Sequence, residues 1–524
     1  MTPEKVIIYD TTLRDGAQSE GIAFSTEDKL EILKKLDSFG VSFAEGGWPG
    51  ANPKDDEFFR QAGGLKLSHT ALAAFGSTAK HGTPPGEDRN LISLASCSAE
   101  WCCIFGKSWD FQVEKALCIP LEDNLIMIRD SVRFLRDSGK RVMFDAEHFF
   151  DGYRSDRSYA MKALSAAAEG GAEWLVLCDT NGGTMTCDIA SAVEDVVLAF
   201  DVPVGIHCHN DSDLAVANSI AAVESGASMV QGTINGIGER CGNANLCSVI
   251  ANLSLKLGYD IDVRDVSMLA EVSEFVGETA NAAPSPSLPY VGEKAFAHKG
   301  GIHVSAMSKD PRTYEHIPPE AVGNRRRILI SDMAGKASIS EKLKEFGIDA
   351  DAEESRIIVG RIKEMEAEGY QFEGADASFE LLVRRLRGEM EPPFRVTGFR
   401  VFIDDAQEKT TSEASVKVED SNGIEEHTAS NGDGPVNALD NALRKALSRF
   451  FPVVKDIRLT DYKVRVLDGT SATAATVRVL IRSTNGKNSW TTVGVSENVI
   501  EASLDALTDS IEYAIYKDRR EVNE

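Results

Sequence analysis

The chain has 524 residues, of which 42% are hydrophobic and 26% charged, a composition typical of a globular protein with three or four domains. It carries 56 basic and 82 acidic residues, so the formal net charge is −26, which disfavours nucleic acid and anionic membrane surfaces as partners. No apolar run is long enough to span a membrane, no targeting signal precedes the first predicted strand, and the nine cysteines form no CxxC pair. We therefore expect a cytoplasmic protein with reduced thiols that take no part in its chemistry.

The first half of the chain alternates short apolar segments with segments of helical spacing. The predicted strands are residues 6–9, 43–46, 70–75, 91–95, 142–145, 174–178, 204–207 and 229–232. Helices are predicted between them at residues 27–39, 125–138, 158–168, 188–199 and 213–224. Eight strands alternating with helices over about 250 residues are typical of a (β/α)8 TIM barrel. The competing fold, an open doubly wound sheet, would carry a GxGxxG motif after its first strand, and this chain does not.

The rest of the chain divides into two further parts. The barrel is expected to end near residue 275, and the proline-rich stretch 282–289 begins a region of mostly helical linker subdomains, residues 276–391, with helices at 339–346 and 353–368. Residues 392–524 contain two similar units. The first has strands 394–403 and 413–418 and a helix from 432–435 to 447; the second has strands 462–467 and 474–483 and a helix from 496–498 to 516. This internal pseudo-repeat indicates a C-terminal α+β domain, and it has no catalytic constellation.

Polar residues gather where the predicted barrel strands end. In such barrels the active site lies at the carboxyl ends of the strands. Six of the eight predicted strands lead into polar segments, at residues 10–16, 45–47, 145–148, 179–183, 207–211 and 236–243. Burying these groups without partners would be costly, so we expect them to form a site.

His207 and His209 form the sharpest candidate within this set. Residues i and i+2 of a strand point to the same face, so both imidazoles can reach one metal ion, although two histidines without a ligand also fit the spacing. Asp15 and Asn243 follow the first and eighth strands and would add oxygen donors once the barrel closes. Such a set suits Mg²⁺, Mn²⁺ or Zn²⁺ with positions left open for substrate, and the absence of thiolate disfavours a structural zinc site.

Four further residues have two interpretations each. Arg14 can stabilise charge on a carbonyl oxygen beside the metal, or it can pair with an acidic residue across the barrel mouth. Glu45 and Glu147 can act as acid and base groups, or they can neutralise nearby arginines. Thr180 can donate a hydrogen bond to a substrate carboxylate, or it can cap the next helix.

The motifs at residues 10–16, 207–209 and 236–243 resemble the DRE-type barrel metallolyase superfamily, which includes the isopropylmalate, homocitrate and citramalate synthases and hydroxymethylglutaryl-CoA lyase. Residues 299–303 resemble a motif of the synthases' linker subdomain, and residues 432–437 resemble a helix start in their regulatory domain. The resemblance therefore covers essentially the whole chain and argues against the lyase branch. Residues 45–55 and 106–110 resemble the citramalate synthase branch.

The resemblance implies that acetyl-CoA condenses with pyruvate to give (R)-citramalate and CoA, in isoleucine biosynthesis. It implies a divalent metal held by Asp15, His207, His209 and Asn243, and substrate binding by Arg14, Glu45 and Thr180. Arg14 also matches the arginine that polarises the keto group, and Glu147 a glutamate that positions acetyl-CoA or its enolate. His303 matches a histidine supplied by the partner subunit, and Tyr314 a tyrosine near it. The base is either His303 or Glu147.

The resemblance further implies a homodimer whose C-terminal domain binds isoleucine between its two pseudo-symmetric units. Three other functions stay open at this point. One is an isopropylmalate synthase, which takes the wider substrate 2-oxoisovalerate; residues 72–107, where the family places its apolar selectivity residues, do not map individually. The second is a metal-dependent lyase that runs the reverse cleavage, and the third is a catalytically silent barrel that only senses an amino acid.

Overall fold

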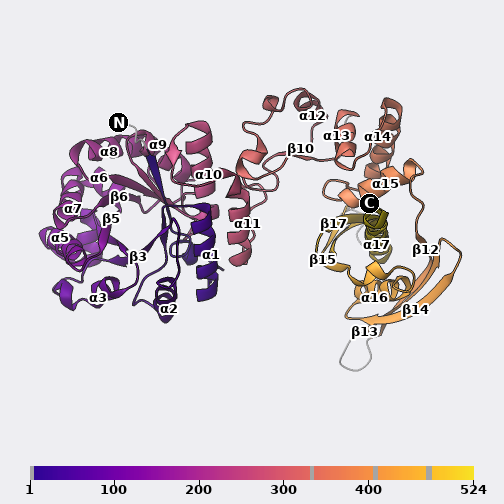
Figure 1. Ribbon diagram of the computed structural model, residues 1–524, viewed down its shortest axis with the longest axis horizontal. Coiled ribbons are helices and arrows are strands. Elements are labelled where there is room, and N and C mark those ends of the chain that lie inside the picture. The colour runs from indigo at the N-terminus through magenta and orange to yellow at the C-terminus, as the bar shows by residue number, and fades with distance from the viewer. Residues whose placement is uncertain (1–4, 331–335, 405–410, 468–474, 524) are drawn as a thin grey trace. The chain divides into compact units, whose positions relative to one another are not determined.

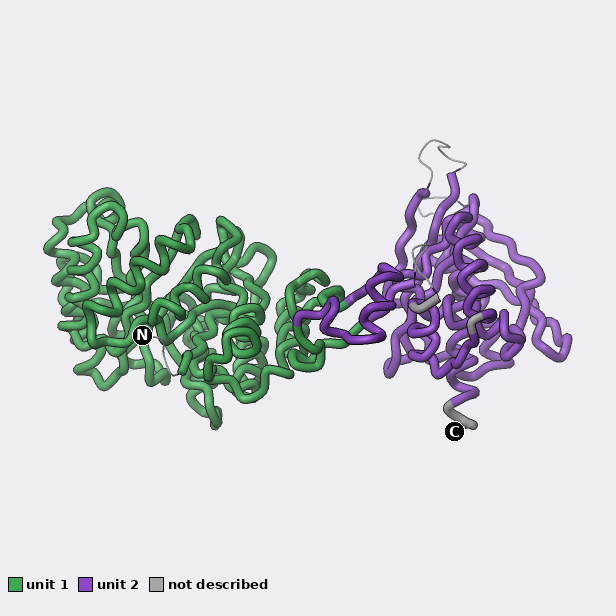
Figure 2. Tube along the Cα trace, turned by 90° about the horizontal axis from the view of Figure 1, so that it is seen from above, with its two compact units in different colours: residues 1–296, 317–326 green, residues 297–316, 327–524 purple. Residues whose placement is uncertain are grey.

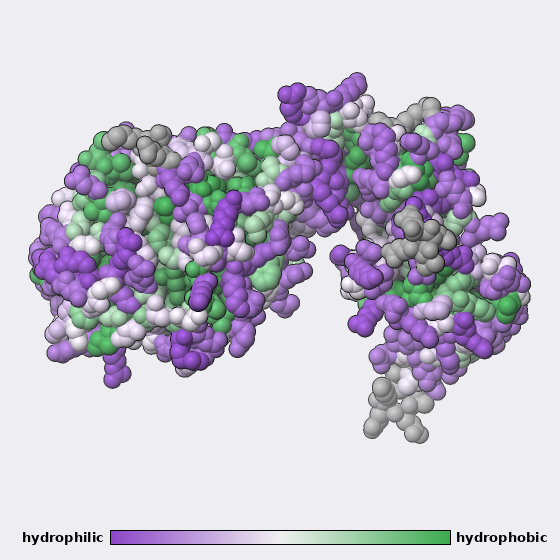
Figure 3. Space-filling view, viewed as in Figure 1, coloured by the Kyte–Doolittle hydropathy of each residue, from purple (hydrophilic) through white to green (hydrophobic). Residues whose placement is uncertain are grey.

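The structure is a computed structural model that describes residues 5–330, 336–404, 411–467 and 475–523 (Figure 1). The chain forms two compact units (Figure 2). Unit 1 comprises residues 1–296 and 317–326, and unit 2 comprises residues 297–316 and 327–524. No helix among the described residues is long and apolar enough to cross a membrane. On the face shown in Figure 3, hydrophilic side chains are spread over both units, with smaller apolar patches between them.

Unit 1 is a closed barrel of eight parallel strands. These are β1 (Lys5–Asp10), β2 (Phe43–Glu45), β3 (Ala71–Ser77), β4 (Trp101–Lys107), β5 (Arg141–Glu147), β6 (Trp174–Asp179), β7 (Val204–Cys208) and β8 (Met229–Gly232). Each strand pairs with the next, and β1 pairs with both β8 and β2, which closes the sheet. The short strand β9 (Asp260–Ile261) pairs with the start of β1. The predicted TIM barrel is confirmed.

Helices surround the barrel, as Figure 1 shows. They are α1 (Thr26–Phe39), α2 (Pro53–Ala62), α3 (Arg89–Ser96), α4 (Asp110–Gln112), α5 (Leu121–Asp137), α6 (Phe149–Ser155), α7 (Arg157–Gly170), α8 (Thr186–Ala199), α9 (Ala215–Glu224), α10 (Leu246–Ala251) and α11 (Leu269–Thr279). The largest apolar core lies between these helices and the outer faces of the strands, with Leu33, Phe144 and Ile206 fully buried in it. A second cluster, including Tyr9, Met143 and Val176, fills the barrel interior, so the barrel is packed except at its carboxyl end.

The strand predicted at residues 91–95 is wrong, because this segment is helix α3. The Asp88 side chain accepts hydrogen bonds from the backbone N–H groups of Asn90 and Leu91, at 3.0 and 3.1 Å, and so caps the helix. Leu91 and Leu94 are buried while Ile92 is 41% exposed, which is helical spacing rather than a strand's alternation. The fourth barrel strand is instead β4, whose nearly continuous apolar sequence suits a strand covered on both faces.

Unit 2 begins with small elements and three longer helices. They are β10 (Ala297–His298), α12 (Gly301–Met307), β11 (Arg327–Ile328), α13 (Lys336–Glu345), α14 (Ala352–Ala367) and α15 (Asp376–Leu386). The helices predicted at residues 339–346 and 353–368 correspond to α13 and α14. A small core that includes Ile339, Ile358 and Phe379 joins α13, α14 and α15.

The C-terminal part of unit 2 repeats a three-strand unit followed by a helix. The first repeat is β12 (Phe394–Asp404), β13 (Thr411–Asp420), β14 (Glu425–Gly432) and α16 (Pro435–Leu447); the second is β15 (Arg458–Val466), β16 (Val477–Thr484), β17 (Ser489–Ser496) and α17 (Val499–Asn523). Both sheets are antiparallel. The predicted repeat is confirmed as an α+β domain, but the prediction omitted β14 and β17. Residue 474 of the predicted strand 474–483 lies outside the described residues.

Candidate active site

A cavity of about 220 Å³ opens at the carboxyl end of the barrel. Its walls come from residues at or after the ends of the barrel strands, where the polar segments of the sequence were expected to meet. They are Arg14, Asp15, Gln18, Trp48, Phe75, Phe105, Asp145, Glu147, Cys178, Thr180, His207, His209, Glu239 and Arg240. The cavity therefore brings most of the predicted site residues of the barrel together.

Asp15, His207 and His209 form a buried cluster of possible metal ligands, with one ligand atom from each within 4.8 Å of the others. The Nε2 atoms of the two imidazoles lie 3.3 Å apart, and His207 Nε2 lies 3.7 Å from Asp15 Oδ2. Two nitrogen ligands of one metal, each bound at about 2.1 Å, are separated by about 3.0–3.4 Å. The spacing of the imidazoles therefore fits a shared divalent cation.

Asn243 supplies a second observation that fits a cation. It is joined to His209 by an antiparallel bridge, and its Nδ2 donates to Asp15 Oδ1 at 2.9 Å. Its buried Oδ1 has no hydrogen-bond partner within the described part of the chain. Buried amide oxygens are normally satisfied, and a divalent cation beside Asp15 would satisfy this one. Two imidazoles, a carboxylate and an amide oxygen suit Mg²⁺, Mn²⁺ or Zn²⁺.

The protonation states of these groups also favour metal binding. Burial lowers the pKa of His207, and burial together with the neighbouring His207 lowers the pKa of His209 to about 4. Both imidazoles are therefore neutral at pH 7, as a metal ligand must be. Burial alone would raise the pKa of Asp15, but Arg14 and the two imidazoles hold it well below its usual range, so the carboxylate stays ionised.

Arg14 is fixed on three sides. Its Nε donates to Glu45 Oε2 at 2.6 Å, its Nη1 donates to Asp15 Oδ2 at 2.9 Å, and its guanidinium lies 3.6 Å above the centre of the Phe75 ring. Glu45 is fully buried, also accepts from Tyr9 Oη at 2.8 Å, and does not line the cavity. The ion pair that was one interpretation of Arg14 is therefore present, and it orients the guanidinium that borders the cavity.

Glu147 and Thr180 line the cavity on the side of β5 and β6. Glu147 Oε2 pairs with Lys107 Nζ at 2.5 Å. Thr180 Oγ1 accepts from the backbone N–H of His148 at 2.8 Å, and a hydroxyl that accepts one hydrogen bond can still donate another. Thr180 does not cap the next helix, because α8 begins at Thr186.

His303 and Tyr314 belong to unit 2 and are not among the residues that line the barrel cavity. Their rings stack on each other, with centroids 4.1 Å apart and planes inclined by 25°. His303 lies on α12, and Tyr314 is 44% exposed. The two residues thus form a pair of their own.

An aromatic wall was missed by the sequence analysis. Phe75 and Phe105 stack with centroids 5.4 Å apart, and Trp48 meets both rings edge-on at 5.6 and 5.8 Å. The period of two along β3 and β4 would have assigned both phenylalanines to the barrel interior. Cys178 also lines the cavity, and burial raises the pKa of its thiol far above the usual value.

Comparison with known families agrees with this architecture. Residues 5–276 match the HMGL-like family, residues 290–370 the homocitrate synthase post-HMGL domain-like family, and residues 373–515 the LeuA allosteric (dimerisation) domain. The parallel barrel and the Asp-His-His cluster at its carboxyl end therefore define an HMGL-like barrel enzyme.

Full-length relatives narrow this class. The chain is 53% identical to an (R)-citramalate synthase of Aquifex aeolicus, with 99% of each chain covered, and 51% identical to one of Geobacter sulfurreducens, with 98% of each covered. It is 35% identical to a probable 2-isopropylmalate synthase of Methanopyrus kandleri, with 97% of this chain and 98% of the other covered. The chain belongs to the (R)-citramalate synthase family, and it is an enzyme of the acyltransferase class.

Proposed function

We propose that this chain condenses acetyl-CoA with pyruvate and hydrolyses the thioester to release (R)-citramalate and CoA, as a step of isoleucine biosynthesis. The observation that carries the proposal is the Asp15, His207 and His209 cluster, which lies beside Arg14 in a cavity of only about 220 Å³. The aromatic wall of Trp48, Phe75 and Phe105 bounds this space and favours a keto acid as small as pyruvate over the wider 2-oxoisovalerate.

Different residues of the chain take different roles in the proposed condensation. Asp15, His207, His209 and Asn243 would hold the cation, which when bound supplies Lewis acidity and a template for the keto acid. Arg14, already oriented by Glu45 and Asp15, stabilises the negative charge that develops on the keto oxygen. Such pre-orientation lowers the reorganisation needed during the reaction.

A hydrogen-bond donor and a base complete the set of groups. Thr180 donates its hydroxyl to the keto-acid carboxylate. The base that removes a proton from the acetyl methyl group is His303, supplied by the partner subunit with Tyr314 next to it, or Glu147 at the cavity wall. The ring stacking of His303 on Tyr314 supports a role for the two as a pair.

The test follows CoA release with pyruvate, 2-oxoisovalerate and 2-oxoglutarate in parallel, with and without a chelator. We expect CoA release with pyruvate that chelation abolishes, and at least tenfold lower kcat/KM with the two larger keto acids. A higher kcat/KM with 2-oxoisovalerate would identify an isopropylmalate synthase instead. Cleavage of citramalyl-CoA to acetyl-CoA and pyruvate without net synthesis would indicate a lyase.

The C-terminal match to an allosteric dimerisation domain indicates a dimer with an effector, and we propose a homodimer whose effector is isoleucine. We keep the division into a catalytic barrel (1–275), linker subdomains (276–391) and a regulatory domain (392–524) as part of this proposal.

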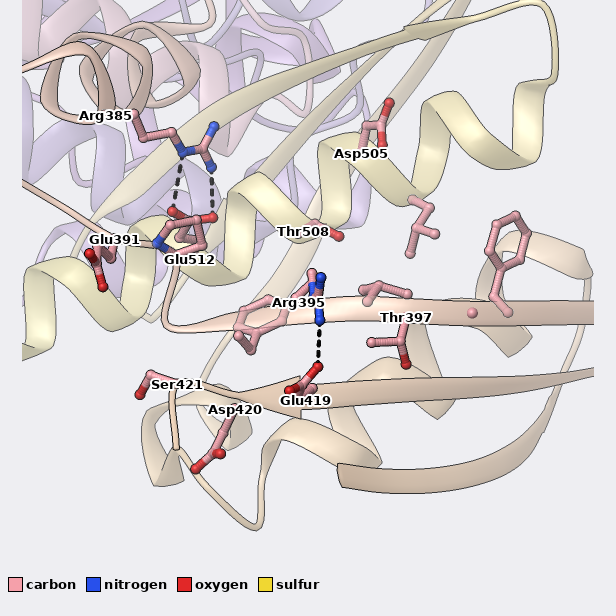
Figure 4. A pocket seen from close by; sticks show the side chains of 16 residues that line it. Arg385, Glu391, Arg395, Thr397, Glu419, Asp420, Ser421, Asp505, Thr508 and Glu512 are labelled. Atoms are coloured by element: carbon pink, nitrogen blue, oxygen red, sulfur yellow. Dashed lines mark hydrogen bonds and ion pairs between the residues drawn. The ribbon is translucent and has the colours of Figure 1, made fainter. Parts of the chain in front are cut away.

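A cavity of about 800 Å³ lies between β12 and β13 of the first repeat and α17 of the second (Figure 4). It is therefore a candidate for the effector site between the two pseudo-symmetric units.

The chemistry of this cavity suits an apolar amino acid. Phe394, Val396 and Leu504 supply apolar surface, and Asp505 supplies a carboxylate for an ammonium group. Arg395, which pairs with Glu419 at 2.7 Å, supplies a guanidinium at the opposite wall for a carboxylate.

The full-length chain and Asp505→Asn test the effector site. We expect the variant to raise the isoleucine concentration for half-inhibition about tenfold without changing basal turnover, because it removes the charge partner of the ammonium group. Asp518→Asn, at an exposed position of α17, is the control. Equal inhibition of all three proteins would remove this cavity as the effector site.

A further inference from the structure

We propose that Gln231 and Asp145 are positioning residues that hold His207 in the tautomer and orientation that bind the divalent cation. This inference rests on the proposed function, since it concerns a ligand of the same metal. Gln231 lies on β8, Asp145 on β5 and His207 on β7, and none of the three is more than 4% exposed. The sequence analysis did not single out Gln231.

The three side chains form a line of hydrogen bonds across the barrel interior. His207 and Gln231 are register partners in the β7 and β8 pair, and His207 Nδ1 lies 3.0 Å from Gln231 Oε1. Gln231 Nε2 donates to Asp145 Oδ1 at 3.1 Å. The line thus runs from the metal cluster to the Asp145 carboxylate on β5, a strand that pairs with neither β7 nor β8.

The partners of this line determine which way each group faces. Asp145 Oδ1 accepts a second hydrogen bond, from Cys103 Sγ at 3.1 Å, so this oxygen serves as an acceptor and the amide nitrogen of Gln231 must face it. The amide oxygen then faces His207 and requires a proton on Nδ1. The Nε2 lone pair is consequently directed towards Asp15 and His209, as metal ligation demands.

A purely structural role for Gln231 makes a different prediction. A buried amide must find partners wherever it lies, so its bonds alone would show only that the interior is satisfied. In that case Gln231→Leu would lower stability and leave metal affinity unchanged. If Gln231 instead sets the tautomer of His207, the variant would lose metal affinity about 10- to 100-fold, the usual effect of removing the partner of a ligating histidine.

The experiment measures Mn²⁺ affinity and the visible absorption spectrum of bound Co²⁺ for the full chain without acetyl-CoA. We expect Gln231→Leu to bind Mn²⁺ 10- to 100-fold more weakly and to alter the Co²⁺ spectrum. The double variant Gln231→Glu with Asp145→Asn should recover most of the affinity, because the glutamate accepts from His207 Nδ1 and the asparagine donates to the glutamate. Gln231→Met, which keeps the length but removes the acceptor, replaces the leucine variant if that protein does not fold.

The outcomes separate this inference from the proposed function. If the wild-type chain binds the cations and Gln231→Leu or Gln231→Met binds them equally well, the positioning role is wrong while the proposed function stands. A double variant as weak as the single one would also overturn the role, since the restored acceptor would then have no effect. If the wild-type chain binds neither cation, the proposed function and the inference both fail.

Discussion

Asp10 shows how a single buried carboxyl ties the first strand to the last one of the barrel. It ends β1, is fully buried, and accepts hydrogen bonds from Thr12 N at 3.0 Å and Thr12 Oγ1 at 2.8 Å. Thr12 Oγ1 in turn accepts from the backbone N–H of Ile234, after β8, at 2.9 Å. These bonds hold the loop that carries Arg14 and Asp15 against the segment that leads to Asn243.

The pKa of Asp10 makes the stability of the barrel depend on pH. Burial raises this pKa to about 7, against the opposing hydrogen bonds from Thr12. Because the folded-state pKa lies above that of the unfolded chain, the folded state binds the extra proton, and this stabilisation is lost as pH rises from about 4 to about 7. Relative to Asp10→Asn, the unfolding free energy of the wild type should fall by about 1.4 kcal/mol per pH unit across this range.

Urea unfolding of both proteins between pH 5 and 8, followed by tryptophan fluorescence, measures this difference. Asp201→Asn, at an exposed position, is the control, and its unfolding free energy should change with pH in the same way as that of the wild type. Parallel curves for Asp10→Asn as well would mean that the buried carboxyl is ionised throughout the range.

At the level of residues, the Asp15, His207 and His209 cluster was predictable from the sequence, and the aromatic wall and Gln231 were not singled out. His207 and His209 stand two apart in one strand, and Asp15 follows another, so strand geometry alone brings their side chains to one end of the barrel. The period of two places Phe75 and Gln231 inside the barrel, but it indicates no role in a site, since aromatic and amide side chains inside a strand are compatible with ordinary packing. Trp48 follows β2 in a loop, where no local pattern marks it. Their roles depend on which side chains lie opposite across the barrel.

Among the elements, helices α1 and α2 are joined by a buried ion pair that supports the cavity wall. Lys29 Nζ donates to Asp55 Oδ1 at 2.6 Å and to the carbonyl of Gly46 at 3.0 Å. Asp55 Oδ2 accepts from the backbone N–H of Trp48 at 3.0 Å. The pair thus anchors the loop after β2, which carries one of the three aromatic residues of the wall.

Breaking this pair should destabilise the barrel strongly. Lys29→Met leaves the buried Asp55 carboxylate without its cation, which typically costs about 3–5 kcal/mol. Lys34→Met is the matched control on the same helix, because Lys34 is 51% exposed in its pair with Glu31 and its loss should cost about 0–1 kcal/mol. Thermal denaturation of both variants checks the difference, and equal losses would show that the Lys29 pair contributes no more than a surface pair.

The errors in the predicted elements have a common physical origin. The segment of α3 was predicted as a strand because a short apolar run fits either structure, and the helix cap of Asp88 decided the outcome. Strand β14 was missed because its sequence is largely polar: it reads EEHTASNG, and only alternate residues are partly buried. Such a strand forms because β13 offers it hydrogen bonds, which no local pattern reveals.

On the scale of the whole molecule, helix α15 joins the helical part of unit 2 to its C-terminal α+β part. Its Phe379 packs with α13 and α14, and its Ala377 packs in the C-terminal core. Ser378 Oγ donates to Asp509 at 2.7 Å, and Arg385 donates to Glu512 at 2.6 Å, both on α17. A truncation near residue 391 would expose these contacts, so the regulatory domain is better tested by point variants than by removal.

The division into two units predicts two thermal transitions with different responses to metal. All four proposed ligands lie in unit 1, so Mn²⁺ at 100 times its Kd should stabilise that unit by about 2.7 kcal/mol and leave the other unchanged. Differential scanning calorimetry with and without Mn²⁺ measures both transitions, and His207→Ala should remove the shift. A single transition that shifts as a whole with Mn²⁺ would show that the units unfold as one.

The most direct test of the account is a crystal structure of the protein with Mn²⁺ and pyruvate, using anomalous scattering to locate the metal. The account predicts one strong anomalous peak about 2.1–2.3 Å from donor atoms of Asp15, His207 and His209, with pyruvate between this peak, Arg14 and Thr180. A metal bound elsewhere in the chain, or pyruvate bound away from the carboxyl end of the barrel, would contradict it.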